Sequence, residues 1–179
     1  MMNTAGLFFP LAALLSAAAL EDMRHHRIPN LLVFPGAALG VALKGFQASG
    51  FFAGSLEGIE GWGLALALLF PLYWLRVMGA GDVKLVAMVG AYLGPADLPW
   101  ALLATFLAGG AMAIAIVLRD RTFMRLMQNL KSLVLGSVME VSAGSLPVMG
   151  ELPGSVGNIP YAVPIGIGTM GYLIWQHLT

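Results

Sequence analysis

Two aspartates, Asp22 and Asp82, are the residues of this 179-residue chain whose type and placement favour chemistry. Each lies at the end of an apolar run, and acidic side chains at the depth of a membrane are costly and mark functional sites. Two neighbouring carboxylates can share a proton, so one acts as a general base on water while the other protonates a carbonyl or a leaving amine. Such a pair suits hydrolysis of a peptide bond without a metal ion, a thiol or a serine triad.

The composition indicates that these aspartates belong to a membrane protein. Hydrophobic residues make up 59% of the chain and charged residues 10%, and the mean hydropathy is +0.85. Soluble domains contain about 45–50% apolar and about 25% charged residues, so a soluble enzyme and a disordered chain are disfavoured. The formal net charge is zero and cysteine is absent. These two facts argue against a nucleic-acid partner and exclude disulfides, thiolate zinc sites and a cysteine nucleophile.

Six apolar runs are candidates for the membrane-spanning helices that would position the aspartates. A span needs about 20 mostly apolar residues, and the runs cover residues 4–20, 28–46, 59–78, 83–93, 98–118 and 159–178. The first run is expected to be a retained helix, because no Lys or Arg precedes Arg24 as a secretory signal requires. We therefore predict an all-α, polytopic integral membrane protein with six transmembrane helices in a single domain over residues 1–179.

The segment between the fifth and sixth runs has a different pattern, typical of an amphipathic helix lying in the membrane interface. Its apolar residues recur at steps of three and four: Phe123, Met127, Leu130, Val134, Val138 and Val141. Basic residues are interspersed among them. We predict this helix over Thr122–Glu140, on the cytoplasmic side.

The placement of the basic residues predicts the orientation. All of them except Lys44 lie in or beside the connections that follow the first, third and fifth runs: Arg24, Arg27, Arg76, Lys84, Arg119, Arg121, Arg125 and Lys131. With six spans these connections lie on one side, which the positive-inside rule makes cytoplasmic. The expected location is therefore the bacterial inner membrane, with both termini outside and Asp22 and Asp82 at the cytoplasmic face.

The other acidic residues are expected to be solvated loop charges. Glu57, Glu60 and Asp97 are predicted in external connections. Asp82 differs, because the run that it opens extends only to Gly94. About 12 helical residues span about 18 Å, against about 30 Å of hydrocarbon, which would draw Asp82 into the bilayer. The alternative at this point is that Asp82 merely caps its helix.

The ordered motifs of the chain resemble those of a known family. Asp22 is followed by Ile28-Pro29-Asn30, then by Gly79-Ala80-Gly81-Asp82-Val83-Lys84-Leu85, and finally by Ile159-Pro160-Tyr161 and Gly168-Thr169. This set resembles the type IV prepilin peptidases, which are GxGD-type aspartic proteases of the membrane. The resemblance implies that Asp22 and Asp82 are the catalytic pair. It implies supporting roles for Gly79, Gly81, Lys84, Pro29, Asn30, Pro160 and Tyr161, and it implies no cofactor or metal.

The same resemblance implies the substrate class. It is a prepilin whose short basic leader is cut at the cytoplasmic face, before its hydrophobic N-terminal helix. Larger members carry paired cysteines that bind zinc and are associated with N-methylation; the absence of cysteine here argues against methyl transfer. The small size resembles the peptidase-only branch that serves tight-adherence (Flp-type) pili. Two alternatives are a proton-coupled carrier that uses the same aspartates and a non-catalytic pilus-assembly protein.

The supporting residues carry more local expectations. Pro29 suits the first turn of the second helix, and Asn30 would cap that helix or hydrogen-bond across to the active region. Lys84 would either extend to the lipid headgroups or contact substrate. Because Asp82 opens a helix whereas Asp22 lies near the end of one, the helix dipole suggests that Asp82 is the base and Asp22 the proton donor.

Overall fold

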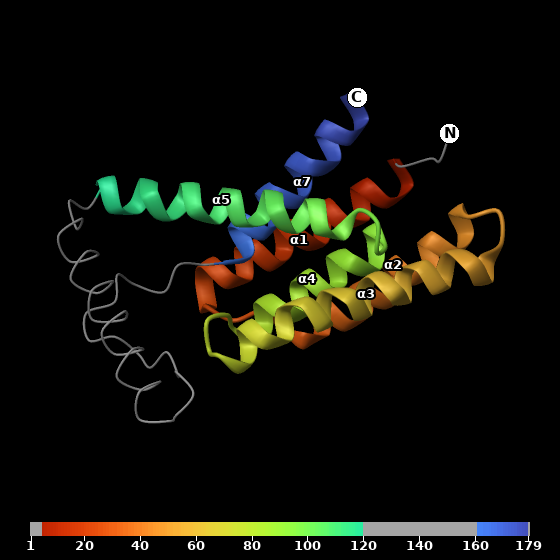
Figure 1. Ribbon diagram of the computed structural model, residues 1–179, viewed down its shortest axis with the longest axis horizontal. Helices are drawn as coiled ribbons and strands as arrows, with labels where there is room; N and C mark the ends of the chain where they lie inside the picture. Colours follow the sequence, from red (N-terminus) through yellow and green to blue (C-terminus); the bar gives the residue numbers. More distant parts are fainter. Residues whose placement is uncertain (1–4, 120–160, 179) are drawn as a thin grey trace.

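The computed structural model describes residues 5–119 and 161–178, and all of its regular structure there is helical (Figure 1). The helices are α1 (Ala5–His25), α2 (Asn30–Gln47), α3 (Phe51–Trp74), α4 (Ala80–Leu93), α5 (Leu98–Arg119) and α7 (Ala162–Leu178). Each predicted apolar run therefore corresponds to a helix, and the all-α fold class is confirmed. The amphipathic helix predicted over Thr122–Glu140, and Pro160, lie outside the described residues.

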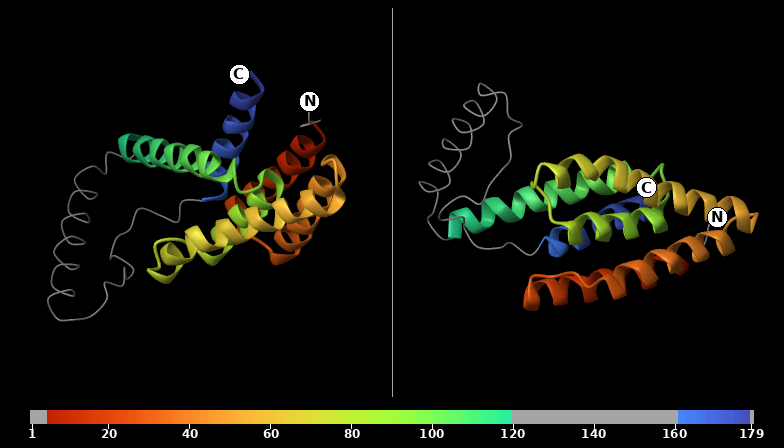
Figure 2. Two further views of the ribbon diagram at one scale, coloured as in Figure 1. Left: turned by 45° about the vertical axis from the view of Figure 1, so that its right-hand side comes forward. Right: turned by 90° about the horizontal axis from the view of Figure 1, so that it is seen from below.

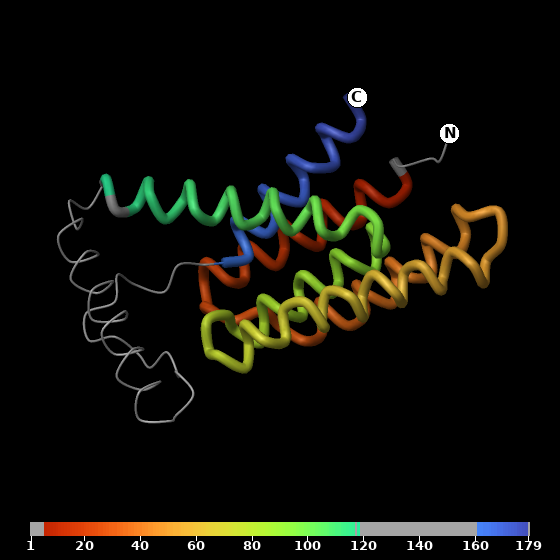
Figure 3. Tube along the Cα trace, in the orientation of Figure 1, coloured from red at the N-terminus to blue at the C-terminus, as the bar shows by residue number. Residues whose placement is uncertain are grey.

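Consecutive described helices run in opposite directions, so the bundle has two distinct ends (Figures 1 and 3). One end, here called the Asp82 end, holds the last turns of α1, α3 and α5 and the first turns of α2, α4 and α7. This alternation is the one that the distribution of basic residues predicts. It brings Asp22 and Asp82 to the same end although 60 residues separate them in the chain, the difference between their numbers.

α4 is the central helix of the bundle. It packs mainly on α3 and α2 and also contacts α1, α5 and α7, and Figure 2 shows it enclosed by these elements. From Val83 to Leu93 its residues are buried, with the single exception of Lys84. Its 14 residues give a helix of about 21 Å. Its first turn is thereby fixed by packing on several sides.

Glycines let α3 and α4 approach one another by their backbones. A Cβ atom on Gly61 of α3 would collide with the carbonyl oxygen of Gly90 in α4, and a Cβ on Gly90 would collide with the carbonyl oxygen of Gly61. Only glycine permits so close a crossing, which is typical of helix packing in membranes. This contact fixes α4 along α3.

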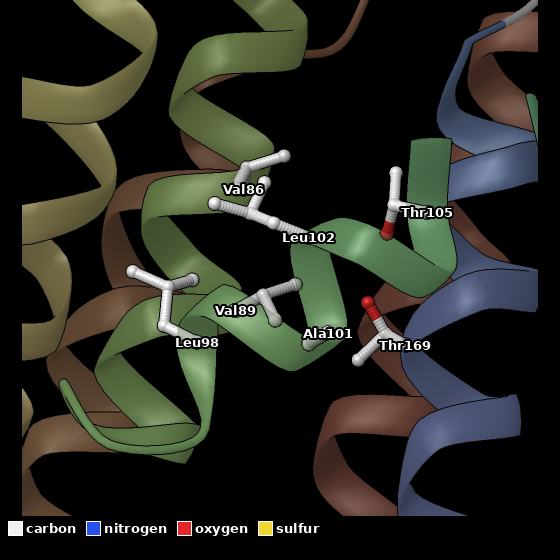
Figure 4. Close-up of a pocket in the computed structure, with 7 residues that line it drawn as sticks. All are labelled: Val86, Val89, Leu98, Ala101, Leu102, Thr105 and Thr169. Atoms are coloured by element: carbon white, nitrogen blue, oxygen red, sulfur yellow. The ribbon is translucent and has the colours of Figure 1, made fainter. Parts of the chain in front are cut away.

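α5 and α7 form a second closely packed pair. A Cβ on Gly168 of α7 would collide with the backbone of Thr105 in α5, and the side chains of Thr105 and Thr169 face each other across this contact (Figure 4). Between this pair and α4 lies a small apolar gap, lined in part by Val86 and Leu102, with no room for a water molecule. The α5–α7 pair therefore packs directly against α4.

Three of the described helices are long and apolar enough to cross a membrane. The segments are Gly6–His25, Phe51–Trp74 and Leu98–Ile116. The other three are shorter, with 18, 14 and 17 residues in α2, α4 and α7. A helix that crosses the hydrocarbon needs about 20 residues, so the six-span topology stays a prediction.

The expectation that Glu57, Glu60 and Asp97 are solvated loop charges is wrong in part. Both glutamates lie inside α3, because that helix begins at Phe51 rather than at Ile59. Glu57 forms an ion pair with the buried Lys44, with its Oε2 3.0 Å from the Lys44 Nζ. Asp97 precedes α5, and its Oδ1 accepts a 2.7 Å hydrogen bond from the Tyr172 hydroxyl. These two acids join helices at the end opposite Asp82.

Candidate active site

The structure brings the two predicted aspartates together at the Asp82 end. Asp22 lies in the last turn of α1 and Asp82 in the first turn of α4. Their carboxylates are close enough for the charge of one to act on the other. Asp22 is buried, with 7% of its surface exposed, whereas Asp82 is half-buried. One carboxylate of the pair is thus enclosed by protein, and the other is open to solvent on one side.

Asp22 is held by the backbone of a third helix. The N–H of Ala162, the first residue of α7, donates a 3.0 Å hydrogen bond to Asp22 Oδ2. The first N–H groups of a helix have no partner within that helix, and they favour negative charge. Asp22 therefore lies near the C-terminus of its own helix and at the N-terminus of α7. The helix dipole was expected to favour the ionised form of Asp82 over that of Asp22. Because both carboxylates lie at helix N-termini, it does not distinguish the base from the proton donor.

Asp82 is held by the start of its own helix. Gly79 is the N-cap residue of α4 and Asp82 the third helical residue. The Asp82 carboxylate accepts a hydrogen bond from the Gly79 backbone N–H, which is the return contact of a capping box. The cap is thus real, and it coexists with the approach to Asp22. Capping by Asp82 was expected as an alternative to a place beside Asp22, and the structure has both.

The two glycines of the motif make room for this arrangement. A Cβ on Gly79 would lie 3.0 Å from Asp82 Oδ2, and a Cβ on Gly81 would lie 3.3 Å from the Cβ of Ile28. Ile28 belongs to the connection between α1 and α2, which passes over the first turn of α4. At Gly81 the missing side chain lets the connection between α1 and α2 approach α4, whereas at Gly79 the close neighbour is the Asp82 carboxylate of the same helical turn.

Lys84 and Asn30 are joined across helices. The Lys84 Nζ donates a 3.1 Å hydrogen bond to Asn30 Oδ1 and lies 5.6 Å from the centre of the Phe34 ring. Of the two roles expected for Asn30, the structure has the one across to α4. Pro29 is the N-cap residue of α2 and lies just before the first turn in which it was predicted.

The C-terminal motif divides between the site and the packing of α7. Tyr161 immediately precedes α7 and is 39% exposed, and its ring lies against Gly109 of α5. Gly168 and Thr169 instead lie in the α5–α7 contact. Of the described residues of the C-terminal motif, Tyr161 is thus the one that lies at the Asp82 end.

The donor at Ala162 is the contact that sequence reasoning missed. A backbone N–H leaves no signal in the residue type, and its partner depends on where α7 starts relative to α1. The only available signal was the apolar run that begins near Pro160. Within the described part of the chain, no three His, Cys, Asp or Glu side chains form a group that could hold a metal ion.

The comparisons with known proteins agree with these motifs. A model of the type IV leader peptidase family matches residues 9–114, more than half of the chain. The chain is 34% identical over 124 residues to a prepilin leader peptidase/N-methyltransferase of Pseudomonas aeruginosa, covering 65% of this chain and 41% of that protein. It is 31% identical over 120 residues to the protein of that name in Stutzerimonas stutzeri, covering 63% of this chain and 40% of that one.

A relative with the same description in Burkholderia pseudomallei is 35% identical over 118 residues, covering 63% of this chain and 38% of the relative. The chain therefore spans about 40% of the length of these curated relatives. No solved structure matches the chain significantly. The matched region, residues 9–114, contains Asp22, Asp82 and the contacts between α1, α2 and α4.

Proposed function

The chain belongs to the type IV leader peptidase family, and from this premise we propose that it is a membrane aspartic endopeptidase that removes the leader peptide of a type IV prepilin. The observation that carries the proposal is that Asp22, in the last turn of α1, and Asp82, in the first turn of α4, lie at the same end of the bundle, near enough for the charge of Asp22 to act on Asp82. These aspartates come from the two motifs of the chain that resemble the family. A buried carboxylate and a half-buried one at a single site support hydrolysis by a proton-sharing pair.

In the proposed reaction one aspartate accepts a proton and the other donates one. One carboxylate takes a proton from water as the water oxygen bonds to the carbonyl carbon of the scissile peptide. The other, protonated, carboxyl gives its proton to the amide nitrogen, and the carbon–nitrogen bond breaks to leave a carboxylic acid and a new amino terminus. The backbone N–H groups of Ala162 and Gly79 hold the two side chains in place.

The proposal includes the orientation and the substrate. The exposed basic residues Arg24, Arg27 and Arg76 lie at the Asp82 end, which we assign to the cytoplasmic face of the inner membrane by the positive-inside rule. The substrate is then a prepilin whose leader is in water and whose hydrophobic helix stays in lipid, in a six-span protein. We propose a prepilin of the Flp type, and leader removal without methyl transfer.

The test is cleavage of a purified prepilin by the purified protein in detergent. The wild type is expected to release the leader, and Asp22→Asn and Asp82→Asn are each expected to lower the rate at least about a hundredfold, because general acid–base groups contribute factors of this size. Glu60→Gln, on α3 and outside the site, is the matched control and is expected to cleave at the wild-type rate.

Other outcomes would overturn the proposal. A wild type that does not cleave the prepilin but drives proton-coupled uptake in vesicles would identify a carrier. Aspartate variants that cleave normally would exclude the pair as the catalytic groups. A wild type inactive in both assays would indicate a non-catalytic protein.

A further inference from the structure

We propose that the backbone N–H of Ala162 is a positioning group for catalysis. It holds the Asp22 carboxylate, and α7 acts as a rigid strut that keeps this N–H in place. The inference rests on the proposed function and deepens it, since it adds a third helix to a site that the motifs assign to α1 and α4. Its basis is the 3.0 Å hydrogen bond from the Ala162 N–H to Asp22 Oδ2.

Both partners of this hydrogen bond are buried. Ala162 is 0% exposed and Asp22 is 7% exposed. Water therefore has little access to Oδ2 and cannot easily replace the N–H. Loss of this donor would leave a buried carboxylate oxygen without its hydrogen-bond partner. A carboxylate has about four lone-pair sites, so a bond to Oδ2 leaves Oδ1 able to act on water or on a shared proton. The contact thus orients the Asp22 side chain and leaves its second oxygen free for the reaction.

The N–H is itself fixed, because α7 is held at two further points along its length. Gly168 lies directly on the backbone of Thr105 in α5. The Tyr172 hydroxyl donates to Asp97, which precedes α5. Ten residues separate Ala162 from Tyr172, or about 15 Å of helix. α7 therefore cannot slide along α5 without breaking the Gly168 contact or the Tyr172 hydrogen bond.

The position of Ala162 allows a substitution that removes the donor and is compatible with the start of a helix. Proline has no N–H and is favoured at the first position of a helix, where its fixed φ is already helical. Ala162→Pro is thus expected to keep α7 and lose the hydrogen bond to Asp22. Ala162→Gly, which keeps the N–H, is the matched control. In prepilin cleavage, Ala162→Pro is expected to lower kcat about tenfold or more with KM changed less than about twofold, and Ala162→Gly is expected to retain most of kcat.

A second measurement does not depend on the folding of the proline variant. Tyr161-Ala162 is the one Tyr-Ala pair in the sequence, so carbonyl-13C tyrosine with 15N alanine gives a single amide signal, that of Ala162. Asp22→Ala is expected to move its proton resonance upfield by more than about 0.5 ppm through loss of the hydrogen bond, whereas Asp82→Ala is expected to leave it nearly in place.

The outcomes separate this inference from the proposed function. A wild type that does not cleave the prepilin overturns the proposed function and the catalytic role of the N–H with it. An active wild type with an equally active, folded Ala162→Pro protein overturns the inference alone. An Ala162 amide proton resonance that does not shift in Asp22→Ala overturns the inference as well, even if the proline variant does not fold.

Discussion

Lys84 of α4 and Asn30 of α2 are joined by a 3.1 Å hydrogen bond, although 54 residues separate them in the sequence. Asn30 is the first residue of α2, and Lys84 follows Asp82 by two positions. The bond therefore ties the segment after Asp22 to the segment that carries Asp82. Since Phe34 lies 5.6 Å below the Lys84 ammonium, the lysine is held by a carbonyl oxygen and by an aromatic ring. This is the direct side-chain link between the two motifs.

Removing either partner of this link is expected to reduce activity. Lys84→Met keeps an apolar stem but loses the donor, and Asn30→Ala loses the acceptor. Each is expected to lower the free energy of unfolding by about 1 kcal/mol and kcat of prepilin cleavage several-fold, because the first turn of α4 is less firmly placed. Thermal unfolding in detergent and the cleavage rate measure the two effects.

The double variant makes the test specific. If the two residues act through their mutual hydrogen bond, Lys84→Met with Asn30→Ala is expected to be little worse than either single variant. Lys84→Arg, which can donate to Asn30 and stack on Phe34, is the control that keeps the donor and the positive charge. Losses that simply add in the double variant would mean that Lys84 acts elsewhere, for instance on the substrate.

The crossing of α3 and α4 predicts opposite effects for two glycines of α3. A Cβ on Gly61 would collide with the Gly90 carbonyl oxygen, whereas a Cβ on Gly63 meets nothing within 4 Å. Gly61→Ala is expected to lower the free energy of unfolding by about 1–3 kcal/mol, since neither backbone can yield easily. Gly63→Ala is expected to be neutral or stabilising by up to about 1 kcal/mol through helix propensity. Equal melting temperatures for the two variants would argue against the close crossing.

The ion pair between Lys44 and Glu57 predicts an asymmetric response. The Lys44 side chain is 9% exposed and that of Glu57 56%, and a Cβ on Gly94 would lie 2.5 Å from the Lys44 ammonium. Glu57→Gln leaves this charge buried without its carboxylate and is expected to cost about 1 kcal/mol, a value reduced because Glu57 is largely solvated.

Lys44→Met removes the buried charge itself, so a further Glu57→Gln change is expected to cost little in that background. Chemical denaturation of the single and double variants measures this coupling. The prediction is contradicted if Glu57→Gln costs the same with and without Lys44.

Much of the fold could be predicted because apolar runs report helices directly. α4 illustrates this, because the sequence predicted both its end at Gly94-Pro95 and its short length. Its first turn lies at the GxGD motif, as expected. The start of α3 was missed by eight residues, the distance from Phe51 to Ile59. Glu57 and Glu60 were predicted in an external connection, but they lie inside α3, and Glu57 pairs with Lys44 of α2, a partner that no local pattern reveals.

The site shows the same division. The motifs pointed to Asp22, Asp82 and the small residues around them, because the hydrolysis that we propose needs paired carboxylates with room beside them. The donors that hold the aspartates are backbone groups of Ala162 and Gly79, and any residue except proline supplies such a group. Asp97 lies in the connection between α4 and α5 as predicted, but its hydrogen bond to Tyr172 was missed because that partner is 75 residues away. Tertiary contacts of this kind are not encoded in local spacing.

The end of α7 that holds Tyr172 offers a last test, because α7 connects it to Ala162 at the Asp82 end. Tyr172→Phe removes the hydroxyl that donates to Asp97 Oδ1 at 2.7 Å, leaving the longer 3.4 Å bond from Gln176. The loss of a hydrogen bond to a carboxylate is expected to cost about 1.5 kcal/mol of unfolding free energy. Tyr73→Phe, on the exposed face of α3, is the matched control and is expected to melt like the wild type. If α7 acts as a strut, Tyr172→Phe also lowers kcat about twofold to fivefold with KM unchanged, although its hydroxyl lies about 15 Å of helix from Ala162. A variant that is less stable but has the wild-type kcat would show that the Gly168 contact alone suffices to hold Ala162 at Asp22.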